Sequence, residues 1–218
     1  MERYGNMNEI ELAQKIRTAG ILPVICPANR AELDTLLNAL SGTNISVIEI
    51  TLRNDFATYA IKYIKENCPW LTVGAGTINT PSKLEDAIAC GADFFVAPGI
   101  AEFAHKYVSS HGIIFIHGVS TPSEILKLLN LGYRVMKFFP AEISGGTQAL
   151  KLYSSAFDGV RFIPTGGITA ENLHPYLACD NVVGCGGSFM APKSLLAEGA
   201  TEKIHALIQE LCKKGDKQ

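Results

Sequence analysis

A single lysine interrupts an apolar run of the sequence, and its placement suits amine chemistry. The run Arg134–Pro140 predicts a buried parallel strand that ends near Phe139, because the proline after it cannot donate to a sheet ladder. Burial disfavours the charged form of lysine, and a neutral amine such as that of Lys137 can attack a carbonyl carbon to form a Schiff base. The alternative is a structural lysine that reaches solvent or pairs with a buried acid.

A glutamate lies in a second apolar stretch, Ile48–Arg53. Side chains alternate along a strand, so we expect Glu49, Thr51 and Arg53 to share one face. A buried glutamate needs a partner, which Lys137 or Arg53 could supply. Glu49 would then either move protons beside the amine or form only a structural ion pair, and the sequence leaves both alternatives open.

Glycine-rich segments follow three of the apolar stretches. Pro164–Ile168 and Gly184–Ser188 come late in the chain, where main-chain N–H groups after the last two strands of a barrel can bind a phosphate. Tight turns without a ligand are the alternative. The third segment, Gly74–Thr77, offers a hydroxyl but is no dinucleotide fingerprint, because Asn79 stands where a third glycine would be required.

Short apolar segments alternate with amphipathic segments along the whole chain, at intervals of roughly 20 to 25 residues, which is typical of parallel strands covered by helices. We therefore predict an α/β fold, a (β/α)8 TIM barrel formed by a single domain over residues 1–218, with an open doubly wound sheet as the alternative. An N-terminal helix over residues 8–19 precedes it, and Gly20 ends this helix. The predicted strands are 21–25, 47–52, 72–75, 94–97, 113–116, 135–139, 160–164 and 182–185.

Composition excludes several classes of protein. A formal net charge of -2 gives no electrostatic signature for nucleic acid or an anionic membrane. No apolar run approaches the roughly 18 residues that span a bilayer. The segment Met1–Asn6 is polar and lacks a signal-peptide pattern, and the six cysteines form no C-x-x-C pair. We expect a cytoplasmic protein that acts on a small molecule.

Metal binding has little support in the sequence. The five histidines show no H-E-x-x-H or comparable ligand spacing, so we expect neither a metal nor another cofactor. His117 is the exception among them, because it ends the fifth predicted strand before Gly118 and could face the site.

Taken together, these segments resemble the 2-keto-3-deoxy-6-phosphogluconate (KDPG) and 4-hydroxy-2-oxoglutarate (KHG) aldolase family, which are class I aldolases that fold as (β/α)8 barrels. The resemblance runs from about Ile21 to Ala191. Its motifs are Val47–Arg53, Val73–Thr77, Lys137–Glu142, Pro164–Ile168 and Gly186–Ser188. One position departs from the expected pattern: His117 stands where a proline is expected before Gly118.

The resemblance implies a role for nine residues and a homotrimeric assembly. Lys137 would form the Schiff base and Glu49 would move protons. Arg53 and Thr77 would hold the pyruvate carboxylate, and Phe139 would pack on the pyruvyl end. The substrate phosphate would be held by Gly166, Gly167, Gly187 and Ser188.

The implied reaction is cleavage of KDPG to pyruvate and glyceraldehyde 3-phosphate. Within the class, the alternatives are cleavage of 4-hydroxy-2-oxoglutarate to pyruvate and glyoxylate, or of a related 2-keto-3-deoxy-6-phospho sugar acid. An isomerase or a metal-dependent aldolase on a barrel is a further alternative. A non-catalytic phosphosugar-binding barrel would keep the glycine segments but would have no use for Lys137 beside Glu49.

Overall fold

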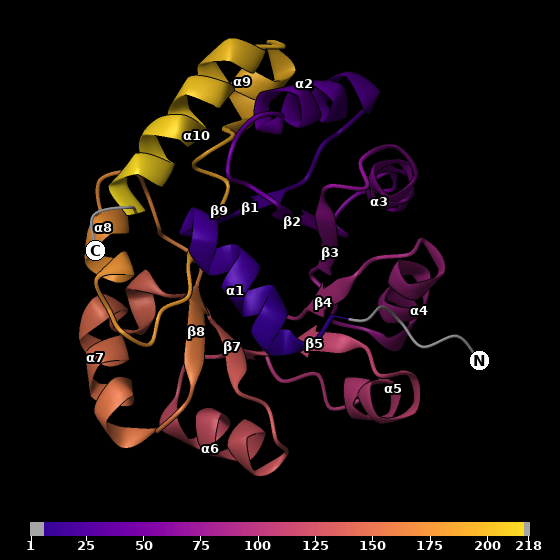
Figure 1. Ribbon diagram of the computed structural model, residues 1–218. Helices are drawn as coiled ribbons and strands as arrows, with labels where there is room; N and C mark the ends of the chain where they lie inside the picture. Colours follow the sequence, from indigo (N-terminus) through magenta and orange to yellow (C-terminus); the bar gives the residue numbers. More distant parts are fainter. Residues whose placement is uncertain (1–6, 216–218) are drawn as a thin grey trace.

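A computed structural model describes residues 7–215, in which short strands alternate with helices along the chain (Figure 1). Every strand pair is parallel. The strands are β1 (Ile21–Ile25), β2 (Val47–Thr51), β3 (Thr72–Gly76), β4 (Phe94–Val96), β5 (Ile114–Ile116), β6 (Gly118–Val119), β7 (Val135–Phe138), β8 (Arg161–Pro164) and β9 (Cys185–Gly187). The α/β class predicted from the alternating pattern is confirmed.

The strands form two sheets that share an apolar interior. The larger sheet has the order β5-β4-β3-β2-β1-β9, and the smaller has the order β6-β7-β8. The larger is a half-barrel of parallel strands. Leu22 and Val47 of the larger sheet and Val135 and Ile163 of the smaller one belong to the same buried cluster. Side chains of the two sheets therefore meet inside the molecule.

The helices surround the strands in Figure 1, and several begin at the caps that the sequence contains. At the start of α6 (Pro122–Asn130), Thr121 and Glu124 form a capping box. At the start of α4 (Pro81–Ala89), the Thr80 side chain accepts from the Lys83 N–H. The helices are α1 (Glu9–Ala19), α2 (Arg30–Leu40), α3 (Phe56–Asn67), α4 (Pro81–Ala89), α5 (Ala104–His111), α6 (Pro122–Asn130), the 3-10 helix η1 (Glu142–Ser144), α7 (Gly146–Ala156), α8 (Leu173–Leu177), α9 (Lys193–Ala197) and α10 (Thr201–Gly215).

Helix α1 covers the N-terminal end of the strands (Figure 1). Its buried residues Leu12, Ala13 and Ile16 pack into the interior cluster, and Gly20 ends it with φ 71°, a left-handed conformation that glycine adopts without strain. Because all the strands run parallel, their carboxyl ends meet at the end of the molecule opposite α1. That end carries the residues predicted to do chemistry.

Two expectations from the sequence concern membrane crossing and export. None of the helices within residues 7–215 has the length and apolar character that crossing a membrane requires. Residues 1–6, on which the expectation about export depends, lie outside the described part of the chain.

Candidate active site

Lys137 and Glu49 form an ion pair across the interior of the molecule. Lys137 is on β7 in the smaller sheet and Glu49 is on β2 in the larger one, yet Lys137 Nζ lies 3.6 Å from Glu49 Oε1. The two side chains are only 9% and 2% exposed. Within residues 7–215, Glu49 Oε1 has no hydrogen-bond partner. A buried oxygen left without a partner beside an amine is poised to bond to a further polar group.

Glycines on β3 make the room that Glu49 occupies. Strand β3 pairs with β2, with Gly74 opposite Glu49 and Gly76 opposite Thr51. A Cβ atom at Gly76 would overlap Glu49 Oε1, and a Cβ atom at Gly74 would overlap the Phe94 ring. The two small residues are therefore required by the position of the carboxylate and of its neighbouring aromatic ring.

Thr77 follows β3 directly and adopts an unfavourable backbone conformation. Its φ angle is 64°, and among the described residues it is the only residue other than glycine with positive φ. Such a conformation costs roughly 1 to 3 kcal/mol and is found preferentially at functional sites. This observation supports a special role for Thr77, although its hydroxyl makes no hydrogen bond to another described residue.

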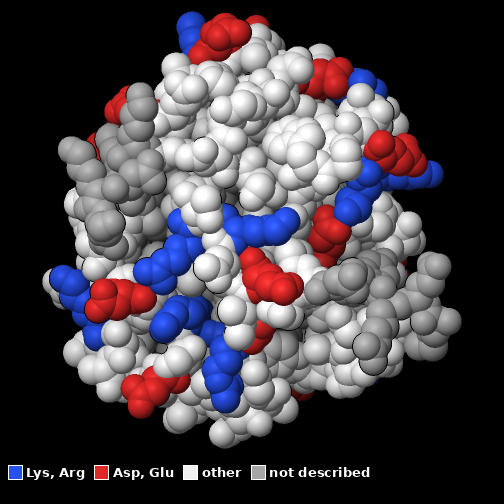
Figure 2. Space-filling view, viewed as in Figure 1, with Lys and Arg blue, Asp and Glu red and all other residues white. Residues whose placement is uncertain are grey.

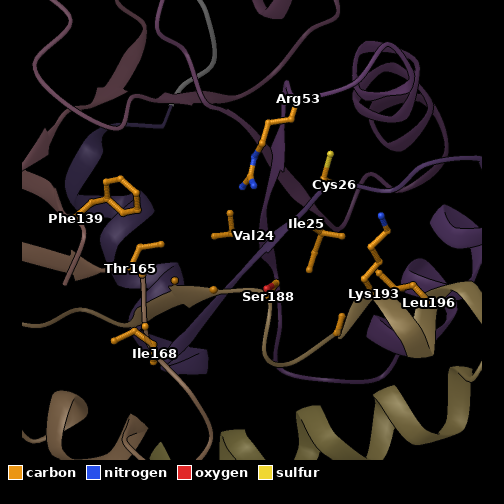
Figure 3. Close-up of a pocket in the computed structure, with 15 residues that line it drawn as sticks. Val24, Ile25, Cys26, Arg53, Phe139, Thr165, Ile168, Ser188, Lys193 and Leu196 are labelled. Carbon is orange, nitrogen blue, oxygen red and sulfur yellow. The ribbon is translucent and has the colours of Figure 1, made fainter. Parts of the chain in front are cut away.

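A cavity of about 370 Å³ opens at the carboxyl ends of β1, β8 and β9 (Figure 3). Arg53 and Phe139 point toward the same space, and Ser188 lies on the far side of it from Arg53. Arg53 forms no ion pair with another residue in 7–215, so its guanidinium group is available to an anion. The cavity is lined by Val24, Ile25, Cys26, Arg53, Phe139, Thr165, Gly166, Gly167, Ile168, Gly186, Gly187, Ser188, Ala191, Lys193 and Leu196.

Six of the nine predicted site residues thus line one cavity, and the other three lie outside its lining. Lys137 is connected to it through Phe139, whose ring centroid lies 5.4 Å from Lys137 Nζ. Glu49 is connected through its ion pair with Lys137, and Thr77 through its neighbour Gly76. The amine and the glycine segments therefore belong to one continuous region at the carboxyl ends of the strands.

Neighbouring residues hold the Gly166–Gly167 segment in place from behind. Glu142 N donates to the Gly166 carbonyl at 3.2 Å, and Asn172 Nδ2 donates to the Gly167 carbonyl at 2.9 Å. Both glycines have positive φ, 95° and 83°. A Cβ atom at Gly167 would lie 2.5 Å from Glu142 Cγ. The segment therefore needs glycine for both its conformation and its packing.

Comparison with known proteins identifies the family. The model of the aldolase family described as KDPG and KHG aldolase matches residues 12–207. The chain is 39% identical to the 2-dehydro-3-deoxy-phosphogluconate aldolase of Dickeya dadantii, over 91% of this chain and 93% of that protein. The protein belongs to the KDPG and KHG aldolase family.

Solved structures agree with this placement. The KDPG aldolase of Legionella pneumophila, with pyruvate captured as a covalent carbinolamine intermediate, matches with a TM-score of 0.83 and 34% identity, covering 92% of this chain and 95% of that one. The aldolase of Zymomonas mobilis ZM4 with 3-phosphoglycerate matches with a TM-score of 0.84 and 35% identity, covering 94% and 96%.

In this KDPG and KHG aldolase family member, His117 lies away from the site, and the expectation that it could face the site is wrong. It is fully buried, and its ring packs against those of His105, Phe115 and Tyr133. Its Nδ1 accepts from the Ala101 N–H at 3.2 Å. Burial, with a smaller contribution from nearby His105, lowers the pKa of His117 to about 3, so the ring is neutral.

Metal coordination has no candidate centre in the part of the aldolase that the structure describes, where no group of three or more His, Cys, Asp or Glu side chains is arranged to hold an ion. Sequence reasoning missed Lys193, an exposed cation that lines the cavity at the start of α9. A lysine at a helix start has no distinctive pattern, and only its position soon after the Gly187–Ser188 segment could have drawn attention to it.

Proposed function

We propose that the protein cleaves KDPG to pyruvate and glyceraldehyde 3-phosphate through a Schiff base on Lys137. The observation that carries this proposal is the buried amine of Lys137, 3.6 Å from a carboxylate oxygen that has no other partner among the described residues. The relative from Dickeya dadantii is named for this substrate, and the relative from Legionella pneumophila was captured with pyruvate as a carbinolamine.

The reaction begins when the amine of Lys137, after loss of its ammonium proton, attacks the C2 ketone of the substrate. Loss of water from the carbinolamine leaves a cationic imine, which draws electrons from the C3–C4 bond. Glu49, directly or through a water molecule, takes the proton of the C4 hydroxyl as this bond breaks, and the aldehyde leaves. The remaining enamine is protonated at C3, and addition of water to the imine releases pyruvate and the free amine.

The remaining predicted residues would position the two ends of the substrate. Arg53 offers a guanidinium fork to the pyruvate carboxylate, with the Thr77 hydroxyl as a second donor. Phe139 packs on the pyruvyl end, since its ring both lines the cavity and lies 5.4 Å from Lys137 Nζ. The phosphate occupies the part of the cavity bounded by Gly166, Gly167, Gly187 and Ser188.

Cleavage of 4-hydroxy-2-oxoglutarate to pyruvate and glyoxylate is the second candidate, because the matching family covers both activities. The same amine and carboxylate would serve either substrate. Only the phosphorylated sugar acid would use the glycine segments. Hydrogen bonds to a charged group contribute about 1.5 to 3 kcal/mol each, so two of them would favour the phosphorylated substrate by roughly a hundredfold or more in kcat/KM over its unphosphorylated analogue.

Trapping the imine tests the proposal. Borohydride reduction in the presence of pyruvate should add one irreversible adduct, which peptide mass spectrometry should place on Lys137. The Lys137→Ala variant should give no adduct and no turnover while it still folds. A parent enzyme without an adduct, or with its adduct on Lys65 or Lys127, would refute the mechanism and favour the non-catalytic alternative.

We also propose that the two sheets form one closed (β/α)8 barrel in a single domain over residues 1–218. In this arrangement β5 and β6 are one strand, since only His117 separates them. Isolated parallel bridges between Phe162 and Val182 and between Thr165 and Gly186 support contact between the β8 and β9 segments. Such contact would join the two sheets on the side opposite β5 and β6.

A homotrimer in the cytoplasm is the proposed state of the enzyme. Leu126 on α6, Ile143 on η1 and Leu152 on α7 are 51%, 86% and 68% exposed, and apolar surface on neighbouring elements favours contact with another copy. None of the six cysteines, all of which lie within the described residues, forms a disulfide, which suits a reducing compartment. Light scattering should give three times the chain mass of 23.5 kDa, and a monomer would contradict the proposal.

A further inference from the structure

A second groove lies at the N-terminal ends of the strands, opposite the candidate active site. Its volume is about 470 Å³, and it is formed by α1, the starts of β7 and β8, and the segment before β9. Several Lys and Arg side chains lie on this face in Figure 2, with Asp and Glu side chains among them. The residues that line the groove are Ile10, Ala13, Gln14, Arg17, Arg134, Val135, Gly159, Arg161 and Val183. Three of these are arginines and none is an acid, and we call the site the arginine groove.

Main-chain carbonyls hold two of the three guanidinium groups. Arg134 Nη1 donates to the Leu129 carbonyl at 3.1 Å and to the Tyr133 carbonyl at 3.0 Å. Arg161 Nη1 donates to the Val160 carbonyl at 3.2 Å. A guanidinium group has five N–H donors, so these contacts fix the groups in place and leave most of their donors unused.

Acidic side chains do not neutralise this set. Within residues 7–215, none of Arg17, Arg134 and Arg161 forms an ion pair with Asp or Glu. Glu9 is the acidic residue that interacts electrostatically with Arg134, but its carboxylate accepts from the main-chain N–H groups of Arg134 and Val135, and burial raises its pKa. The formal net charge of the chain is -2, so a groove with three arginines that form no ion pair within residues 7–215 carries a local excess of positive charge.

We propose that the arginine groove binds a small polyanion, a molecule with several phosphate or carboxylate oxygens. Guanidinium forks match such oxygens with paired hydrogen bonds, and three of them converge on one space. The apolar side chains of Ala13, Val135 and Val183 line the same groove and strengthen the electrostatic attraction by excluding water. Its volume falls in the range of small-molecule sites, roughly 300 to 1,000 Å³.

The groove is separate from the cavity assigned to the substrate. Arg134 and Arg161 stand at the beginnings of β7 and β8, whereas Lys137 and Gly166 lie at the other ends of the same strands. Binding there does not depend on the proposed aldolase reaction. It can therefore be measured without turnover.

Titration followed by NMR tests this inference on the full chain. Inorganic pyrophosphate and citrate serve as phosphate and carboxylate probes, each compared with potassium chloride at equal ionic strength. The backbone amides of Gln14, Val135 and Gly159 report on the groove, and that of Gly167 reports on the substrate cavity. We expect saturable shifts at the three groove amides with at least one probe, and the effective probe identifies the class of oxygen that the groove prefers.

Charge-removing variants decide whether the arginines are responsible. Arg17→Gln should weaken binding at the groove amides at least about tenfold, the loss expected for one charge-assisted hydrogen bond. Lys62→Gln on α3 removes the same charge from an exposed position away from the groove and should leave the affinity unchanged. Shifts confined to Gly167, shifts equal to those in potassium chloride, or equal weakening by both variants would overturn the proposal.

Discussion

Gly76→Ala should strongly lower kcat because it displaces the Glu49 carboxylate, but it should not prevent imine formation at Lys137. A Cβ atom at residue 76 would overlap Glu49 Oε1 and would lie 2.6 Å from Glu49 Cδ. Oε1 would lie only 1.9 Å from that Cβ atom and ordinary contact begins near 3.4 Å, so this oxygen must move by roughly 1.5 Å. The obstructing atoms are the far end of a flexible side chain, so the side chain can give way and the backbone of β3 can stay in place.

The size of the effect follows from the role proposed for Glu49. A misplacement of about 1 Å at a reacting group can cost roughly 100-fold in rate, and a general acid-base group contributes roughly 10² to 10⁴-fold. We therefore expect kcat for KDPG to fall about 100-fold, which corresponds to about 2.7 kcal/mol in the activation barrier. Borohydride trapping with pyruvate should proceed nearly as in the parent, because attack by Lys137 does not require Glu49 to move the C4 hydroxyl proton.

Steady-state cleavage and imine trapping measured on the same preparations provide the assay. Gly99→Ala is the matched control, because Gly99 has no positive φ and a Cβ atom there meets nothing within 4 Å. In a Glu49→Gln background, Gly76→Ala should add little further loss, since both changes act on one group. A Gly76→Ala enzyme with nearly normal turnover, or one that loses the same factor again in the Glu49→Gln background, would refute the reasoning.

Two further predictions concern the phosphate segment and the buried histidine. Gly167→Val should lower kcat/KM for KDPG far more than for 4-hydroxy-2-oxoglutarate, because a Cβ atom there lies 2.5 Å from Glu142 Cγ, and Gly159→Val is the control, with a similar positive φ of 75° and open space around it. Equal losses on both substrates would mean that the segment serves only the fold. The folded-state pKa of His117 is depressed to about 3, so only the unfolded chain binds a proton at this histidine as the pH falls below about 6.5. The free energy of unfolding present above that pH is therefore progressively lost toward pH 3. Between pH 7 and 5 this linkage should remove about 2 kcal/mol from the free energy of unfolding, measured by urea denaturation. His117→Gln should lack that component, and an unchanged pH dependence in this variant would contradict the assignment.

Much of the site could be predicted because its residues interrupt regular patterns. Lys137 and Glu49 each place a charge in an apolar strand, and in the structure both side chains are buried and adjacent. Their separation of 3.6 Å could not be predicted, because β2 and β7 belong to different sheets and their approach depends on long-range packing. The backbone conformation of Thr77 could not be predicted either, since nothing in its residue type requires a positive φ angle.

The wrong expectation for His117 shows where the alternation of side chains along a strand cannot tell which face points inward. Strand segments buried on both faces are apolar throughout, so the residues before His117 do not reveal which face points inward. Gly118 decides instead which side chains of this segment face inward. It pairs with Lys137, and a Cβ atom added there would overlap the main chain at Pro98. Because this close approach places Gly118 on the inner face, His117 must point outward to His105 and Tyr133. His117 therefore belongs to the packing around the strand, with His105, Phe115 and Tyr133, and is not among the residues that line the cavity.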